Sequence, residues 1–396
     1  MKRLKNELNS LVNRGVDRHL RLAVTGLSRS GKTAFITAMV NQLLNLHAGA
    51  RLPLLSAVRE ERLLGVKRVP QRDFGIPRFT YEEGLAQLYG DPPTWPTPTR
   101  GVSEIRLALR FRSNESLMRH FKDTSTLYLE IVDYPGEWLL DLPMLAQDYL
   151  TWSRQMTGLL QGQRAGWSAK WRQLCEGLDP LAPADENRLA TIAEAWTAYL
   201  HQCKQEGLHF IQPGRFVLPG DLAGAPALQF FPWPDVDGVG ESKLAQADRH
   251  TNAGMLRERY NYYCEKVVKG FYKNHFLRFD RQIVLVDCLQ PLNSGPQAFN
   301  DMRLALTQLM QSFHYGQRTL FRRLFSPVID KLLFAATKAD HVTVDQHANM
   351  VSLLQQLVQD AWQNAAFEGI GMDCLGLASV QATQSGLIDV SGEKIP

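Results

Sequence analysis

The sequence predicts an α/β protein in which helices flank a mostly parallel β-sheet and a large helical insertion interrupts the chain. Three observations support this prediction. Short apolar runs typical of buried strands alternate with amphipathic helices near the start of the 396 residues, and the same alternation returns near the end. Between them, residues 138–275 show mainly helical periodicity. We therefore expect strands from both sides of the insertion to form one sheet.

The composition disfavours several classes of protein. The chain is 44% hydrophobic, carries a net charge of +4 and contains no dense block of Lys and Arg, so nucleic acid is not an expected partner. Its five cysteines are scattered without CxxC spacing, which argues against a zinc site and favours a reducing compartment. No N-terminal leader and no apolar run of about 18 residues is present, so we expect a cytoplasmic protein.

Residues 1–19 are expected to form an amphipathic helix, with leucines and valines on one face and basic residues around them. Such a helix fits peripheral contact with the inner membrane or with a protein partner. Packing against the body of the protein is the alternative.

The first strand, residues 20–25, leads into Gly-Leu-Ser-Arg-Ser-Gly-Lys-Thr, which fits the phosphate-binding pattern GxxxxGK[ST]. Its glycines allow backbone N–H groups to turn toward a phosphate, and the helix expected over residues 33–46 adds its positive end. Lys32 would reach the β- and γ-phosphates, and Thr33 would bind Mg²⁺. The residues assigned to phosphate binding are Gly26, Ser28, Arg29, Ser30, Gly31, Lys32 and Thr33.

Residues 51–98 combine seven basic residues with interleaved acids and end in a proline-rich stretch that excludes a helix, so we expect an ordered surface loop. In phosphate-switching NTPases the corresponding loop holds a threonine at the metal. Thr97 and Thr99 both precede the strand expected over residues 103–112. Thr99 is favoured because it lies nearer to that strand.

A further strand, residues 126–132, ends at Asp133-Tyr134-Pro135-Gly136-Glu137. Asp133 at a strand end can hold Mg²⁺ through a water molecule, and Gly136 can donate its N–H to a γ-phosphate.

In the middle block, two amphipathic helices are expected around residues 189–203, with Asp185 as the N-cap, and 255–271. The loop between them, residues 213–240, contains Phe-Phe-Pro-Trp-Pro. These aromatic residues fit either a docking surface or a loop pinned to the body of the protein.

The last third predicts strands over residues 282–286, 332–336 and 375–380 and helices over 297–313 and 348–366. Thr337-Lys338-Ala339-Asp340 follows the second of these strands and fits [NT]KxD. The Asp340 carboxylate would accept hydrogen bonds from N1–H and the 2-amino group of guanine, whereas adenine presents an acceptor at N1. Asp287 also ends a strand but lacks a glycine three residues later, so it is interpreted as a polar loop group.

At this point the chain resembles the GTPase class of P-loop proteins and, more closely, the YcjX-like family of bacterial P-loop GTPases associated with envelope stress. The resemblance rests on GLSRSGKT, DYPGEWLLDLP, QPGRFVLPGDLAGAPALQFFPWP, VDCLQPLNSG and TKAD. It implies that Thr337, Lys338 and Asp340 bind guanine, with Ala382 and Thr383 at its O6. Thirteen residues follow Thr383, too few for the usual closing helix, so family members are expected to continue further.

Two departures from the GTPase pattern bear on catalysis. Glu137 occupies the place where small GTPases have the glutamine that orients the attacking water, which suggests slow turnover. Arg29 resembles the arginine finger that guanylate-binding proteins supply in cis, and Arg100 is a second candidate. The catalytic set is therefore Lys32, Arg29, Thr99, Gly136 and Glu137, and the metal set is Thr33, Thr99 and Asp133.

The leading hypothesis is a GTP-binding switch protein that hydrolyses GTP slowly with Mg²⁺, in a bacterial stress response, with an unidentified protein partner. An ATPase and a nucleotide-binding scaffold at the membrane surface with little turnover are the alternatives. The expected organisation is an N-terminal helix (1–19), a nucleotide-binding domain in two parts (20–137 and 276–396) and the insertion (138–275).

Overall fold

The computed structural model describes residues 18–48, 52, 55–112, 124–314, 329, 331–359, 362–363, 370–381, 386, 388–390 and 393–395. The helix expected before residue 18 lies outside these residues. Within them, seven strands form one sheet in the order β2-β3-β4-β1-β5-β6-β7. They are β1 (Arg18–Gly26), β2 (Leu63–Arg68), β3 (Ser103–Arg112), β4 (Thr124–Asp133), β5 (Arg281–Val286), β6 (Lys331–Ala336) and β7 (Gly371–Gly376). A separate hairpin pairs β8 (Ile388–Val390) with β9 (Glu393–Ile395).

The five strands from β4 to β7 run parallel, and this register brings the expected motifs to one edge. Val24 of β1 pairs with Asp133 of β4, Gly26 pairs with Leu285 of β5, and Val286 of β5 pairs with Ala336 of β6. Because these strands end together, the loops that follow them lie side by side. The α/β P-loop GTPase-like fold predicted from the sequence is therefore confirmed.

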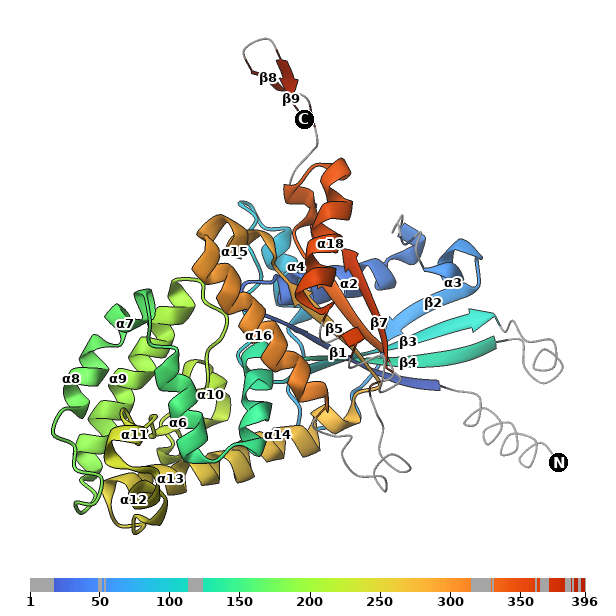
Figure 1. Ribbon diagram of the computed structural model, residues 1–396. Helices are drawn as coiled ribbons and strands as arrows, with labels where there is room; N and C mark the ends of the chain where they lie inside the picture. The colour runs from blue at the N-terminus through green and yellow to red at the C-terminus, as the bar shows by residue number, and fades with distance from the viewer. Residues whose placement is uncertain are drawn as a thin grey trace, which may run out of the picture.

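Helices cover both faces of the sheet (Figure 1). One face carries α2 (Lys32–Leu44), α4 (Tyr81–Leu88) and a core cluster that includes Ile36, Val40 and Leu107. The other face carries α15 (Leu289–Ser294), α16 (Pro296–His314) and α18 (His347–Leu357), whose apolar side chains join a larger cluster with Val132 and Phe334. Short 3₁₀ helices are η1 (Leu46–Ala48), η7 (Ala339–His341) and η8 (Val344–Gln346).

Between β4 and β5 the chain is helical from residue 136 to residue 278, and we call this stretch the helical segment. It extends away from the sheet at the left of Figure 1. Its elements are η2 (Gly136–Ala146), α6 (Tyr149–Gly158), α7 (Gln163–Trp167), α8 (Ala169–Cys175), α9 (Glu186–Gln205), α10 (Gly214–Val217), η3 (Gly220–Leu222), η4 (Pro226–Leu228), α11 (Val236–Val239), α12 (Glu241–Gln246), α13 (Asn252–Tyr262), the π-helix η5 (Tyr263–Val268), α14 (Lys269–Asn274) and η6 (Phe276–Arg278). Asp185 caps α9 as predicted, because its carboxylate accepts the Arg188 N–H at 3.0 Å.

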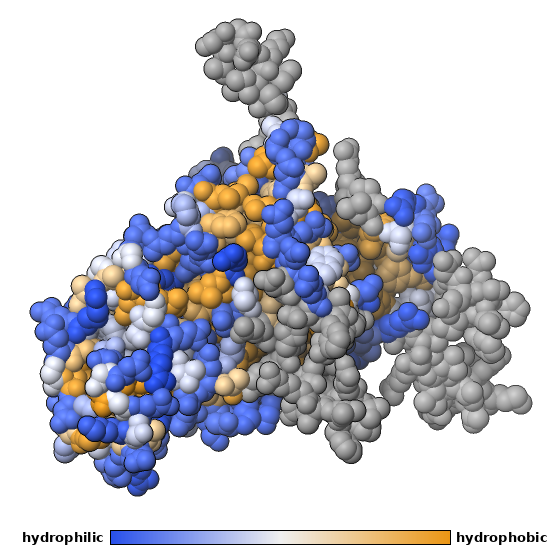
Figure 2. Space-filling model, viewed as in Figure 1, coloured by the Kyte–Doolittle hydropathy of each residue, from blue (hydrophilic) through white to orange (hydrophobic). Residues whose placement is uncertain are grey.

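The aromatic loop of the helical segment is pinned to the body of the protein. Phe230, Phe231 and Trp233 are at most 2% exposed. They are not available as an exposed docking surface. On the face shown in Figure 2, polar residues cover much of the helical segment, while apolar residues gather over α15 and α16.

Two expectations from the sequence are wrong. Residues 51–98 are not simply a loop, because α3 (Ser56–Arg59), β2 and α4 lie within them. The prolines that suggested a loop are concentrated after α4, and β2 is held by antiparallel pairing with β3. The last strand of the sheet is residues 371–376 rather than 375–380, because its position is fixed by pairing with β6 from Lys331 to Ala336.

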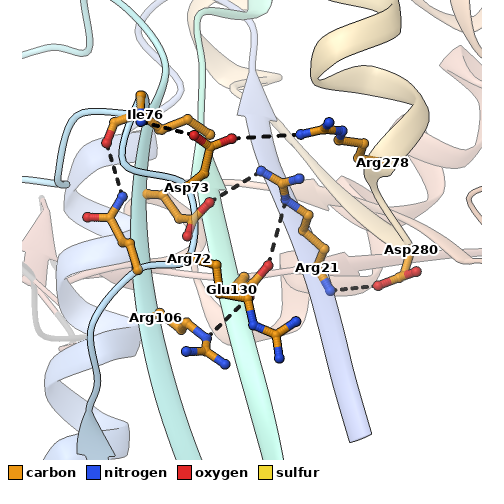
Figure 3. Close-up of polar contacts among 11 residues, drawn as sticks. Arg21, Arg72, Asp73, Ile76, Arg106, Glu130, Arg278 and Asp280 are labelled. Atoms are coloured by element: carbon orange, nitrogen blue, oxygen red, sulfur yellow. Dashed lines mark hydrogen bonds and ion pairs between the residues drawn. The ribbon is translucent and has the colours of Figure 1, made fainter.

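A cluster of ion pairs fastens the chain after β2 to the sheet (Figure 3). Glu130 on β4 accepts contacts from Arg106 at 3.2 Å and from Arg21 and Arg72 at 3.9 Å. The backbone N–H of Arg21 donates to Asp280 at 2.7 Å. The cluster ties β1, β3 and β4 to the start of β5.

Candidate functional site

A cavity of about 710 Å³ opens at the carboxyl edge of the sheet. The phosphate loop, the loop after β6 and residues 379–380 line this cavity. The chain around Thr99 and the end of α9 also contribute to the lining. The lining residues are 26–34, Trp95, Pro96, Pro98, Thr99, Pro135, Glu137, His201, Lys204, Gln205, Leu218, Thr337, Lys338, Asp340, His341, Ser379 and Val380.

The phosphate loop has the backbone shape that an anion cradle requires. Gly31 has a φ of 77° and Arg29 a φ of 65°, both in the left-handed region. Helix α2 begins immediately afterwards, and among the described residues no side chain caps its first turn. The N–H groups at the start of the helix therefore remain available to an anion.

Lys32, Thr33, Thr99 and Asp133 lie together at the floor of the site. The Thr33 and Thr99 hydroxyl oxygens are 3.3 Å apart, and the Thr99 hydroxyl donates to the Asp133 carboxylate. Lys32 forms an ion pair with the other Asp133 oxygen at 2.9 Å and donates to the carbonyl of Tyr134. The structure thus brings Thr99 beside Thr33 as expected.

Thr97 points elsewhere, because its hydroxyl accepts from the Gln87 side chain at 3.0 Å. Of the two threonines considered from the sequence, only Thr99 lies beside the phosphate loop.

The hydroxyls of Thr33 and Thr99 and the carboxylate of Asp133 are the hard oxygen donors that Mg²⁺ prefers. Within the described residues, no group of three or more His, Cys, Asp and Glu side chains is placed to hold a metal ion. A magnesium ion at this position would therefore complete its shell with water and nucleotide oxygens, as it commonly does.

Gly136 packs directly against the phosphate loop. A Cβ atom at this position would approach the Gly26 carbonyl oxygen more closely than 3.0 Å. The neighbours Pro135 and Glu137 line the cavity, and the Glu137 side chain forms a 2.7 Å ion pair with Lys204. Only a residue without a side chain allows the loop after β4 to come this near.

The loop after β6 places Asp340 on the cavity that Lys32 also lines. Thr337 donates its N–H to Val286 at 2.9 Å, and Ala339 donates its N–H to Leu377 at 3.1 Å. Lys338, at the start of η7, adopts a left-handed φ of 61°. These contacts fix the backbone that leads into Asp340.

Asp287 is a buried loop group, as interpreted from the sequence. One carboxylate oxygen accepts the N–H groups of Leu289 and Gln290 at 3.1 and 3.2 Å. The other forms a 2.5 Å ion pair with Lys338. This pair orients the Lys338 side chain toward α15.

Among the expected residues that the structure describes, Arg100, Asp133 and Gly136 are not part of the cavity lining. Arg100 is exposed, whereas Asp133 contacts Lys32 and Gly136 packs against Gly26. Ala382 and Thr383 lie outside the described residues, and the nearest lining residues are Ser379 and Val380.

The sequence reasoning missed the contribution of α9. His201, Lys204 and Gln205, three and four residues apart, face the cavity from the last turn of this helix. Arg29 donates a hydrogen bond to the Gln205 carbonyl at 2.9 Å. Partial desolvation and the nearby Lys204 charge lower the pKa of His201 below its usual value. Spacing along α9 gives no signal that its end contacts a loop 176 residues earlier in the chain.

One protein family, described as "YcjX-like family, DUF463", matches residues 20–396 of the chain. The chain belongs to this family. It is similar to the "Ras-like GTPase YcjX" of Escherichia coli (strain K12), with 92% identity over 396 residues covering 100% of this chain and 85% of the relative. A protein of the same description from Shewanella oneidensis is 46% identical over 396 residues, covering 98% of this chain and 82% of that relative.

One further finding concerns membranes. Among the described residues, no helix has both the length and the apolar character that crossing a bilayer requires.

Proposed function

We propose that this chain binds GTP with Mg²⁺ and hydrolyses it slowly, as a nucleotide-dependent switch. The observation that carries the proposal is one cavity lined by both the phosphate loop and the Thr337–Asp340 loop. A phosphate cradle and a carboxylate suited to guanine thus face the same space. Both relatives are named "Ras-like GTPase YcjX", which supports the same function. The proposed setting in a bacterial stress response rests on the family resemblance alone.

The residues divide into groups by the part of the nucleotide they would meet. The phosphate loop and Lys32 would hold the β- and γ-phosphates through backbone N–H groups and an ammonium group. Thr337, Lys338 and Asp340 would bind the base, with Ala382 and Thr383 assigned to its O6. Thr33, Thr99 and Asp133 would hold the magnesium ion, which when bound neutralises charge that develops on the transferred phosphoryl group.

The reaction would be attack of water on the γ-phosphorus, which requires orientation of the water and stabilisation of negative charge. Lys32 supplies positive charge and Gly136 a backbone N–H. One oxygen of the Glu137 carboxylate forms a 2.7 Å ion pair with Lys204, which lowers the capacity of Glu137 to act as a base and fits slow turnover. Arg29 lines the cavity, and acting on the γ-phosphoryl group would require it to leave the Gln205 carbonyl.

The deciding experiment is a titration of the purified chain with fluorescently labelled GDP and ADP. Because a guanine would pair with the Asp340 carboxylate and an adenine would leave it unpaired, we expect GDP to bind at least about 100-fold more tightly. The Asp340→Asn variant should lose this preference and gain affinity for xanthosine diphosphate, whose C2 carbonyl offers an acceptor. Equal affinity for GDP and ADP would overturn the guanine assignment in favour of the ATPase alternative.

Turnover is tested separately by phosphate release from GTP. We expect slow release that depends on Mg²⁺ and disappears in the Lys32→Ala variant. Release no faster than in that variant would overturn the proposed hydrolysis and leave the scaffold alternative.

A further inference from the structure

The last turn of α9 reaches the end of the cavity where a terminal phosphate would lie. Lys204 contacts Glu137, which follows the glycine expected to bind the γ-phosphate. Gln205 accepts a hydrogen bond from Arg29 in the phosphate loop. The end of α9 thus contacts both of the loops that would face the γ-position.

The cationic side chains that line the cavity differ in the groups with which they are paired. Among the described lining residues, Lys32 is paired with Asp133 and Lys338 with Asp287. Arg29 is directed at the negative end of α9, a favourable position for a cation. Lys204 is paired with Glu137, which itself lines the cavity and is 8% exposed at its side chain.

A nucleoside triphosphate would change the balance at the Glu137–Lys204 pair. A γ-phosphate brings additional negative charge beside a carboxylate that repels it and an ammonium that attracts it. Lys204 has three donors on a flexible stem, so it can turn from Glu137 to a phosphate oxygen or bridge both. A diphosphate leaves the pair as it is.

We propose that Lys204 is a direct ligand of the γ-phosphate, supplied in cis by the helical segment, and that it discriminates triphosphate from diphosphate. This inference rests on the proposed nucleotide function and extends it to the helical segment. Because the contact forms only with the triphosphate, α9 is held differently in the two nucleotide states.

The test compares the affinities of the full chain for GDP and for a non-hydrolysable GTP analogue with a β,γ-methylene bridge. In Lys204→Met, the analogue should bind at least about tenfold more weakly, while GDP affinity changes less than about twofold. Unchanged GDP binding also shows that the variant is folded. Lys204→Arg should recover most of the lost affinity. Lys170→Met, an exposed lysine on α8 outside the cavity, is the matched control and should behave as the unaltered chain.

A double variant separates direct contact from simple neutralisation of Glu137. If Lys204 contacts the phosphate, the variant that combines Glu137→Gln with Lys204→Met still binds the analogue weakly. Recovery of normal analogue affinity in the double variant would overturn the proposal, as would equal weakening of GDP and analogue in Lys204→Met. The preference for guanine over adenine is measured separately, on the unaltered chain. If that preference is absent, the guanine assignment fails, and the Lys204 comparison is repeated with ADP and the corresponding ATP analogue.

Discussion

Asp141 makes the stability of this protein depend on pH in a direction opposite to that of most carboxylates. It lies in η2, four residues after Glu137, and is 2% exposed. Its oxygens accept the Tyr263 hydroxyl at 2.5 Å and the Gly214 N–H at 2.8 Å. Burial raises its pKa from 3.8 to about 7, against the opposing effect of these hydrogen bonds and of Arg215.

The sign of the effect follows from linkage. A carboxyl whose pKa is higher in the folded state binds its proton more tightly there, so it stabilises the fold below pH 3.8 and this stabilisation is lost as the pH rises through about 7. The full change corresponds to about 4 kcal/mol, of which about 3 kcal/mol falls between pH 5 and pH 8. Asp141→Asn replaces the carboxyl with a neutral amide that can still pair with Tyr263 and Gly214.

The assay is urea unfolding of the unaltered chain and of Asp141→Asn at pH 5 and pH 8. We expect the variant to gain about 3 kcal/mol relative to the unaltered chain on going from pH 5 to pH 8. Asp345→Asn is the control. Hydrogen bonds from Thr343 and Gln346 lower the pKa of exposed Asp345 below 3.8, so this carboxylate is ionised at both pH values and the variant should follow the pH profile of the unaltered chain. Parallel pH profiles for the unaltered chain and Asp141→Asn would refute the argument from burial.

Three further substitutions test other contacts. Asp301→Ala should lower the free energy of unfolding by about 3–5 kcal/mol, because it leaves buried Arg164, now paired at 2.5 Å, without its partner; a loss below about 1 kcal/mol in urea unfolding would contradict this. Gly136→Ala should weaken GDP binding at least about tenfold, since its Cβ would collide with the phosphate-loop backbone; calorimetry showing unchanged affinity would exclude that collision. Lys338→Met should lower the free energy of unfolding by about 1–3 kcal/mol, because the buried Asp287 carboxylate loses its cationic partner. Thermal unfolding at the same midpoint as the unaltered chain would contradict this.

The strands that the sequence predicts well are those in the middle of the sheet. β1, β4, β5 and β6 are buried apolar runs, and this pattern is sufficient by itself to predict a strand. The two edge strands were missed or misplaced for a shared reason. β2 contains a glycine and ends in basic residues, and β7 begins and ends with glycine, so pairing with a neighbour rather than an apolar pattern determines where each lies.

The same distinction applies to the candidate site. The loops around Lys32, Asp133 and Asp340 were found because each is a short local motif that follows a strand. The contribution of Lys204 has no local signal, since it depends on how the helical segment folds back over the phosphate loop. Thr99 is favoured over Thr97 only because it lies nearer in sequence to the following strand, and the structure places Thr99 beside Thr33.

The larger hydrophobic cluster has a practical consequence for dissecting this protein. It runs without interruption from Val132 and Phe334 on the sheet to Trp152 and Tyr260 in the helical segment. Excising the residues between β4 and β5 would expose the apolar side chains of this cluster that pack against them, so a trimmed nucleotide-binding fragment is a poor reagent. The role of the helical segment is better approached by single substitutions in the intact chain.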